Sequence, residues 1–302
     1  MPTSTSTARF MLIIAATLGT SVALAAHKTY DKRLTAPPGG QLTFRADLGS
    51  VAVVGRDAPE VVVHADLEAS ESFLSDFHIG AEQTPTGVTV SARTTHRDRF
   101  EGFDNGPRVR FTIEVPRNYR VDLRTAGGGL DVRDLNASVH AVTSGGSAMI
   151  QNIAGTVDVH TSGGSIDAQR LKGSSELSTS GGEVNVADSS GDLDLDTSGG
   201  SIGIRNDDGK IDAHTSGGSI RAQLPANHGI NLSTSGGSIT LLLPRDTRAS
   251  LDAETSAGRV KSEFPLSATE ISEKTHLRGA IGGGGARISL HTSAGDIRLE
   301  PR

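Results

Sequence analysis

The side chains most able to do chemistry in this chain form a regularly spaced acidic series. Its central members are the carboxylates Asp158, Glu176, Asp194 and Asp212, each three residues before a threonine of a repeated tetrapeptide. Side chains alternate in direction along a strand, so we expect this series to face outward and to stack at about 4.8 Å. Like charges so close repel one another. Carboxylate oxygens are also ligands of Ca²⁺, so the column is either a solvated face or a weak cation-binding ladder.

The acidic series has less regular members at both ends. These are Asp122, His140, Asn231 and Asp252, with Ser289 at the last corner. Calcium-binding β-rolls also have an 18-residue rung, built from two nonapeptides of the form G-G-x-G-x-D-x-U-x. This chain lacks the third glycine and the following aspartate in each unit, so dedicated calcium corners are not expected. The histidines before the corner threonines are not in adjacent rungs of one column, so no histidine pair for a metal is expected either.

The element that must position this column is a repeat of the tetrapeptide Thr-Ser-Gly-Gly with a spacing of 18 residues. A fixed period of this length is typical of a solenoid, whose units bury their apolar faces by stacking on their neighbours. A variant begins at Thr125, and later copies begin at Thr234, Thr255 and Thr292. The corner residues predicted from the strict copies are Thr143, Gly145, Gly146, Thr161, Gly163, Gly164, Thr179, Gly181, Gly182, Thr197, Gly199, Gly200, Thr215, Gly217 and Gly218.

Apolar residues alternate on both sides of each corner, as at Ile202 and Ile204. Alternation of period two predicts short half-buried strands, two in each rung. We therefore predict an all-β fold, a parallel β-solenoid with rungs of about 18 residues and the usual right-handed crossover. The sequence leaves open whether two or three sheets line the rung. We expect the corner glycines to adopt positive φ and prolines such as Pro225 and Pro244 to occupy the second corner.

Stacking in register places threonine over threonine and serine over serine along one edge of the solenoid. We expect hydroxyl ladders there. They serve either in corner packing and hydrogen bonding or as a flat hydroxyl surface for a regular ligand, such as a polymer or ice. No residue pattern selects such a ligand.

The chain divides into three parts. Residues 1–25 combine Arg9, an apolar run and the ending Ala23-Leu24-Ala25, which predicts a secretory signal peptide; an uncleaved membrane anchor is the alternative. Residues 26–120 predict an irregular β-rich N-terminal cap, and residues 121–302 the repeat solenoid. Removal of Arg9 with the leader leaves 28 basic and 35 acidic residues, a net charge of −7, which argues against a nucleic-acid partner. The absence of cysteine excludes disulfides.

The cap is expected to contain strands at 41–45, 51–54, 61–65, 87–93 and 108–115, with a loop over 96–107. It would cover the first open edge of the solenoid, because an exposed strand edge promotes aggregation. At the other end, we expect Arg298, Glu300, Pro301 and Arg302 to protect the last edge. No second apolar stretch is long enough to span a bilayer, so no transmembrane helix is expected in the mature chain.

The apolar-Pro corner, the alternating strand and the Thr-Ser-Gly-Gly or Thr-Ser-Ala-Gly corner together resemble the bacterial putative-adhesin family with β-strand repeats, a domain family of unknown function. The run Gly282–Leu290, followed by Thr292–Ile297, is similar to the end of that family's domain. The resemblance covers roughly residues 40–300. It implies a single-chain β-solenoid of the cell envelope and carries no catalytic residues. The predicted signal peptide indicates export, to the periplasm or else to the cell surface or outside the cell.

A search of the sequence for catalytic chemistry finds one weak string. Gly199–Gly203 contains G-x-S-x-G, but that motif requires a strand-to-helix elbow, and here it lies in one unit of the repeat. We therefore expect no enzyme, no cofactor and no firm metal site. The favoured function is a noncatalytic envelope scaffold or adhesin-like protein that binds an unknown envelope polymer or protein. The alternative is a polysaccharide-active β-helix enzyme, which would need long loops and a cleft.

Overall fold

The structure is a computed structural model that describes residues 26–95 and 106–302. The predicted signal peptide and residues 96–105 of the predicted loop lie outside the described residues. In the part described, almost every element is a strand, and the predicted all-β parallel solenoid is confirmed. None of the helices described there is long and apolar enough to cross a membrane.

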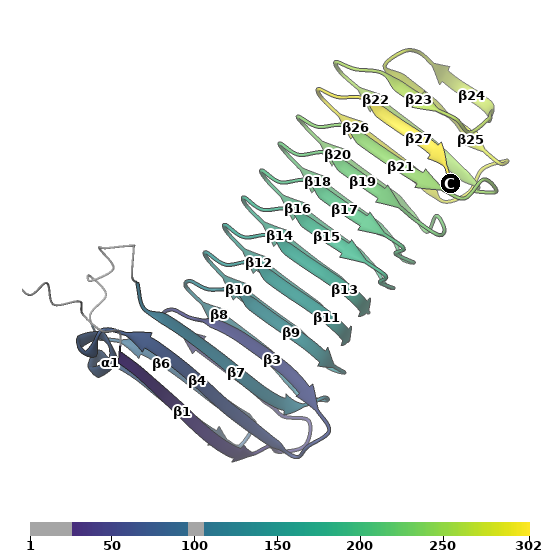
Figure 1. The fold of residues 1–302 in the computed structure, drawn as a ribbon. Coiled ribbons are helices and arrows are strands. Elements are labelled where there is room, and N and C mark those ends of the chain that lie inside the picture. The colour runs from purple at the N-terminus through teal and green to yellow at the C-terminus, as the bar shows by residue number, and fades with distance from the viewer. Residues whose placement is uncertain (1–25, 96–105) are drawn as a thin grey trace, which may run out of the picture.

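Two long sheets face each other along the whole rod, and each rung adds one strand to each sheet (Figure 1). The first sheet has 13 strands, in the spatial order β1 (Ala26–Thr35), β4 (Glu60–Ala69), β7 (Arg108–Pro116), β3 (Ser50–Arg56), β9 (Leu130–Leu135), β11 (Ala148–Ala154), β13 (Ile166–Lys172), β15 (Val184–Ala187), β17 (Ile202–Arg205), β19 (Ile220–Gln223), β21 (Ile239–Leu243), β27 (Ile297–Pro301) and β23 (Val260–Ser262).

The second sheet has 14 strands. Their order is β24 (Leu266–Ser272), β25 (His276–Ile281), β22 (Ala249–Thr255), β26 (Arg287–Thr292), β20 (Ile230–Thr234), β18 (Ile211–Thr215), β16 (Leu193–Thr197), β14 (Ser175–Thr179), β12 (Val157–Thr161), β10 (Val139–Thr143), β8 (Arg120–Thr125), β2 (Gln41–Ala46), β6 (Gly87–Thr94) and β5 (Phe77–Thr84). Two sheets therefore line each rung, which settles the question that the sequence left open.

The core is a thin apolar layer between the two sheets. In β16 the side chains alternate strictly between buried and exposed, and Leu193 and Leu195 are buried. Along the repeat the same columns are filled by Ile, Val, Leu and Ala, with Ser175 as a buried polar exception beside Leu193, so the sheets can lie close together. Buried aromatic rings are concentrated in the cap, where Phe44 and Phe111 pack edge to face with ring centroids 5.0 Å apart, and Phe264 is a buried ring near the C-terminal end.

The N-terminal end contains the five predicted cap strands and three elements that the sequence analysis missed. The missed elements are β1, β5 and the short helix α1 (Glu71–Asp76), which Ser70 caps. The antiparallel pairs β1–β4 and β5–β6 close this end of the two sheets. Parallel stacking already begins within residues 26–120, because β2 pairs with both β6 and β8, and β3 pairs with both β7 and β9.

The C-terminal end corrects one prediction. The last strands do not form the outer edge: β27 lies between β21 and β23, and β26 lies between β20 and β22. Arg298 and Glu300 therefore belong to an internal rung. The outer end is formed instead by β23 and by the antiparallel strands β25 and β24. Sequence order misled the prediction because the chain builds the outer rung first and then returns to fill the place beneath it.

The corner glycines are required for a different reason from the one predicted. In the described chain, none of the glycines of the strict Thr-Ser-Gly-Gly copies has a positive φ. A Cβ on Gly146 would lie only 2.0 Å from the carbonyl oxygen of Gly128 in the preceding rung, whereas a Cβ on Gly145 would have no contact closer than 4.0 Å. The second glycine thus permits close stacking of backbones. The first is replaceable, as Ala257 and Ala294 show.

Candidate binding faces

The outward side chains of the second sheet form an acidic face in the middle of the rod. We use this name for the strand residues Asp158, Glu176, Asp194, Asp196 and Asp212, together with the exposed Asp192 that directly precedes β16. The parallel register places Asp158 beside Glu176, Glu176 beside Asp194 and Asp194 beside Asp212. The four carboxylates of the predicted ladder are therefore stacked in successive rungs. They form a row rather than converging on one point.

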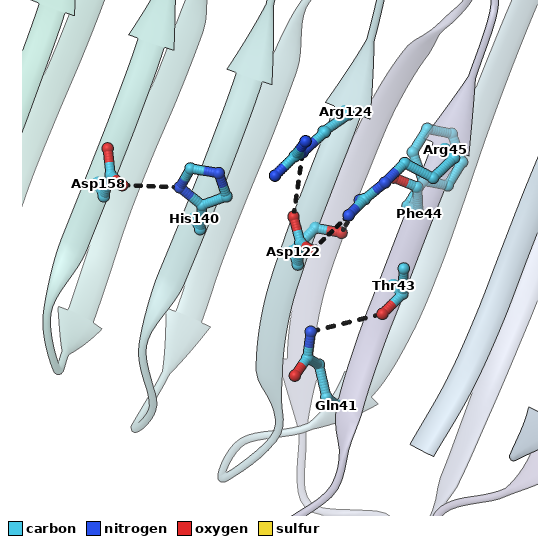
Figure 2. A network of polar contacts seen from close by, with 8 residues as sticks. All are labelled: Gln41, Thr43, Phe44, Arg45, Asp122, Arg124, His140 and Asp158. Carbon is cyan, nitrogen blue, oxygen red and sulfur yellow. Dashed lines mark hydrogen bonds and ion pairs between the residues drawn. The ribbon is translucent and has the colours of Figure 1, made fainter. Parts of the chain in front are cut away.

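Both ends of this row have polar partners. Figure 2 shows that His140 Nδ1 lies 2.7 Å from Asp158 Oδ2 at the cap-proximal end. One rung nearer the cap, Arg45 donates to Asp122 at 2.5 Å, so a cap strand is tied to the first regular rung. At the other end, Asn231 Nδ2 donates to Asp212 Oδ1 at 2.9 Å. Among the described residues, Glu176 and Asp194 in the middle of the row have neither a basic partner nor an amide partner.

Asp194 is the member of the acidic face whose pKa is raised by burial and by its neighbours. Burial raises the pKa of its carboxyl, and the neighbouring charges of Asp196 and Asp212 raise the pKa further.

Within residues 26–95 and 106–302, no group of three or more His, Cys, Asp or Glu side chains is placed to hold a metal ion. The stacking order also differs from the sequence order, since Ser289 lies between Asn231 and Asp252.

The threonine hydroxyls of the corners bond to backbone rather than to one another. Thr161 Oγ1 donates to the carbonyl oxygen of Gly146 in the preceding rung at 2.8 Å, and the same bond recurs along the stack. Thr161 is fully buried. The serines that follow the glycines also bond to backbone: Ser147 Oγ accepts from the N–H of Ser165 at 3.2 Å. The corner threonines hold the rungs together and are not available to a ligand.

The G-x-S-x-G string lies at a corner that leads into β17, not into a helix. Ser201 Oγ accepts from the backbone N–H of Ser219 in the next rung at 3.3 Å. Its hydroxyl therefore takes part in rung stacking, as the other serines of this column do. His160, two rungs nearer the cap, also bonds to the next rung, because its Nδ1 lies 2.6 Å from Ser178 Oγ.

The second corner contains residues that sequence reasoning missed. Five non-glycine residues there have φ between 53° and 63°: Asp134, Asn152, Arg170, Asp188 and Asn206. Their side chains bond between rungs, as when Asn206 Nδ2 donates to Asp188 Oδ1 at 3.0 Å. The signal was present in the sequence, because Asp and Asn tolerate this conformation best and recur here at the 18-residue spacing.

A hollow on the outer face of the first sheet was also missed. We name it the Gly203 hollow; it has a volume of about 350 Å³, and its polar rim consists of Asp167, Gln169, Asn185, Arg205, Arg221 and Gln223. Gly203 interrupts an outward column, since it lies in register between Asn185 and Arg221. A single glycine within a strand pattern was the available signal, because it marks a place where another molecule can approach the backbone.

The chain is similar to several solved structures at low sequence identity. No curated protein sequence matches the chain. Among solved structures, a putative adhesin from Bacteroides fragilis is 10% identical, with 91% of this chain and 97% of that chain covered and a TM-score of 0.44. A putative lipid binding protein from Parabacteroides distasonis is 12% identical, with 91% of this chain and 96% of that chain covered and a TM-score of 0.44. A putative adhesin from Parabacteroides merdae is 10% identical, with 91% of this chain and 96% of that chain covered and a TM-score of 0.39.

The comparison with protein families covers most of the chain. The family model called Toastrack DUF4097 matches residues 54–300, a range that includes the cap strands from β4 onward and every rung of the repeat. The resemblance predicted from the corner motifs is therefore confirmed, and the chain belongs to the Toastrack DUF4097 family.

Proposed function

We propose that this protein is a noncatalytic binding scaffold of the cell envelope, exported to the periplasm, that engages a polymer or another protein through the outer faces of its two sheets. The observation that carries the proposal is the register of outward side chains, which repeats from rung to rung across the stack. A surface of this kind suits a ligand that is itself extended and repetitive.

The short connections between rungs support a binding role over a catalytic one. Enzymes built on solenoids need loops that leave the rungs and enclose a cleft. In the described part of the repeat, the longest departure is the segment of β24 and β25, and it is paired into the second sheet as an end cap. The composition of residues 1–25 supports export.

Binding and turnover can be separated in one experiment. The purified protein is passed over immobilised envelope polysaccharides and envelope proteins, and the eluted polymers are sized. We expect retention of the protein with no change in polymer length. Reproducible release of oligosaccharides would contradict the scaffold proposal and favour a polysaccharide-active enzyme.

Paired variants identify the face that binds. Glu176→Gln with Asp194→Asn alters the second sheet, and Arg205→Gln with Arg221→Gln alters the first. All four positions are exposed on strands, and each replacement leaves a polar side chain there, so the fold should persist. We expect at least one pair to reduce retention, and a pair that leaves retention unchanged would exclude its own face. Equal retention of both pairs and the unaltered protein would exclude both faces.

A further inference from the structure

The Gly203 hollow has the shape and the chemistry of a ligand site. We propose that it binds the sugar-acid units of an acidic polysaccharide, with the arginines taking the carboxylate and the amides taking ring hydroxyls. This rests on the proposed binding function and names the class of ligand for one face of the rod.

The hollow arises because two neighbouring outward positions lack long side chains. In one column the order across successive rungs is Asp167, Asn185, Gly203 and Arg221. In the adjacent column, two residues further along each strand, Ala187 lies next to Arg205. The floor is the strand backbone at Gly203 and Ala187, and longer polar side chains rise around it. Its volume is at the small end of the range for ligand pockets.

One wall offers a hydrogen-bond acceptor. Asn185 Nδ2 donates to Asp167 Oδ1 at 3.3 Å, which leaves the Oδ1 of the same amide on the side of Gly203. A Cβ placed on Gly203 would lie 2.7 Å from this oxygen. A ligand hydroxyl in the hollow could therefore donate to Asn185 Oδ1. Asp167 is engaged by the amide of Asn185.

The opposite side offers positive charge. Arg205 and Arg221 make no ion pair with any of the described residues. Other arginines on this face are paired, as Arg133 is with Asp131 at 3.0 Å and Arg298 with Asp296 at 2.8 Å. Two uncompensated guanidinium groups stand out on a chain whose net charge is −6. A guanidinium group binds a carboxylate through two parallel hydrogen bonds.

The combination of groups favours a sugar acid over an acidic peptide. Gln169 and Gln223 also border the hollow, and an amide both donates and accepts, as a ring hydroxyl does. A glutamate side chain would satisfy the arginines but would bring no hydroxyl to Asn185. The sugar acid uses both sides of the hollow. Its affinity should be modest, because the groups that line the hollow include no aromatic ring on which a sugar could stack.

Titration calorimetry with three probes tests the proposal on the full chain. The probes are tetragalacturonate, which has carboxylates and hydroxyls, an uncharged galactose tetramer and tetraglutamate. We expect measurable binding of tetragalacturonate that weakens as salt is raised, and at least tenfold weaker binding of the other two. Equal binding of tetraglutamate would overturn the sugar assignment in favour of an acidic peptide. No binding of tetragalacturonate would overturn the proposal, while retention on another envelope polymer would preserve the proposed function.

Variants locate the site. Arg221→Gln and Arg205→Gln should each weaken tetragalacturonate binding about tenfold, since each removes charged hydrogen bonds. Gly203→Val should fill the hollow with a side chain suited to a strand and abolish binding. Arg245→Gln removes the same charge at an exposed turn and should have no effect. Melting temperatures verify that each variant is folded. Unchanged affinity in the folded Arg205→Gln and Arg221→Gln variants would overturn the proposal.

Discussion

Thr197 Oγ1 donates a hydrogen bond to the carbonyl oxygen of Gly182 in the preceding rung at 2.8 Å, and it accepts one from the N–H of Gly200 at 3.2 Å. One buried hydroxyl therefore satisfies two backbone groups at a corner where the strand ladders are interrupted. The same arrangement recurs at Thr161, Thr179 and Thr215. This recurrence explains why threonine keeps its place at an 18-residue spacing.

Replacement of Thr197 by valine tests this role. Valine has nearly the same shape but no hydroxyl, so the backbone groups of Gly182 and Gly200 lose their partner in a buried corner. We expect a loss of about 1–3 kcal/mol in the free energy of unfolding, measured by urea denaturation. Thr197→Ser keeps the hydroxyl and should lose much less. Equal stability of the valine variant and the unaltered protein would contradict the role.

The two glycines of one corner should respond differently to the same change. Gly146→Ala would place a methyl group 2.0 Å from the carbonyl oxygen of Gly128, so the rungs must separate, and we expect a loss of more than about 3 kcal/mol. Gly145→Ala has 4.0 Å of clearance, and alanine restricts the unfolded chain, so stability should stay the same or rise slightly. Thermal melting compares the two variants. Similar losses in both would show that backbone flexibility, not contact, selects glycine.

The periodic part of this fold could be predicted well from the sequence. Each rung repeats the same local chemistry, so alternating apolar residues such as Ile202 and Ile204 indicate strands without knowledge of distant contacts. The return of β26 and β27 into the stack could not be predicted in this way. The corner sequences at Thr255 and Thr292 are nearly identical, so either could stack on the corner at Thr234. The strand pairing shows that Thr292 stacks on Thr234 and that Thr255 stacks on Thr292.

The candidate sites were predicted unevenly for a related reason. The acidic column was visible because its members share a charge and a spacing. The Gly203 hollow depends on what is missing from two adjacent columns, and its cations, Arg205 and Arg221, do not repeat. A residue that breaks the repeat, such as Gly203, can be recognised as part of a binding site only when its neighbours in the adjacent columns are known. The function of the corner threonines was left open between a ladder and a ligand surface until their burial was known.

Asp194→Asn should stabilise the protein at low ionic strength. The change removes a negative charge beside Asp196 and Asp212, which raise the pKa of the Asp194 carboxyl in addition to the effect of burial. Like charges in adjacent strands cost up to about 1 kcal/mol, so we expect a gain of about 0.5 kcal/mol that disappears in high salt. Asp246→Asn, at an exposed turn, is the matched control. A large rise in the melting temperature of the unaltered protein with millimolar Ca²⁺, absent from the variant, would show instead that the column binds cations.

Deletion of residues 287–302 should damage more than the end of the rod. These residues supply β26 and β27, which lie between the rung of β20 and β21 and the rung of β22 and β23. Without them, the outer rung and the β24 and β25 cap lose the surface on which they stack. We expect rapid proteolysis of residues 249–286 and protection of the earlier rungs, detected by mass spectrometry of limited digests. Resistance of residues 249–286 would indicate that the outer rung can dock directly on β20 and β21.

Asp207 should make the stability of the protein fall as pH rises toward neutrality. Its side chain is buried at the second corner, with 1% exposure, and no described side chain bonds to its carboxylate. Burial, together with the charge of Asp208, raises the pKa of Asp207 to about 7, and the N–H of Gly209 offsets this only in part.

The folded state therefore binds one more proton than the unfolded state between the unfolded pKa, 3.8, and about 7. Across this window the unaltered protein should lose up to about 1.4 kcal/mol of unfolding free energy per pH unit relative to Asp207→Asn, which cannot ionise. Below pH 4 and above pH 7 the difference should be constant. Urea denaturation of both proteins across this range measures the difference in unfolding free energy directly. The contributions of the other titrating groups are the same in both proteins and cancel. Parallel stability profiles would mean that Asp207 ionises normally in the folded state.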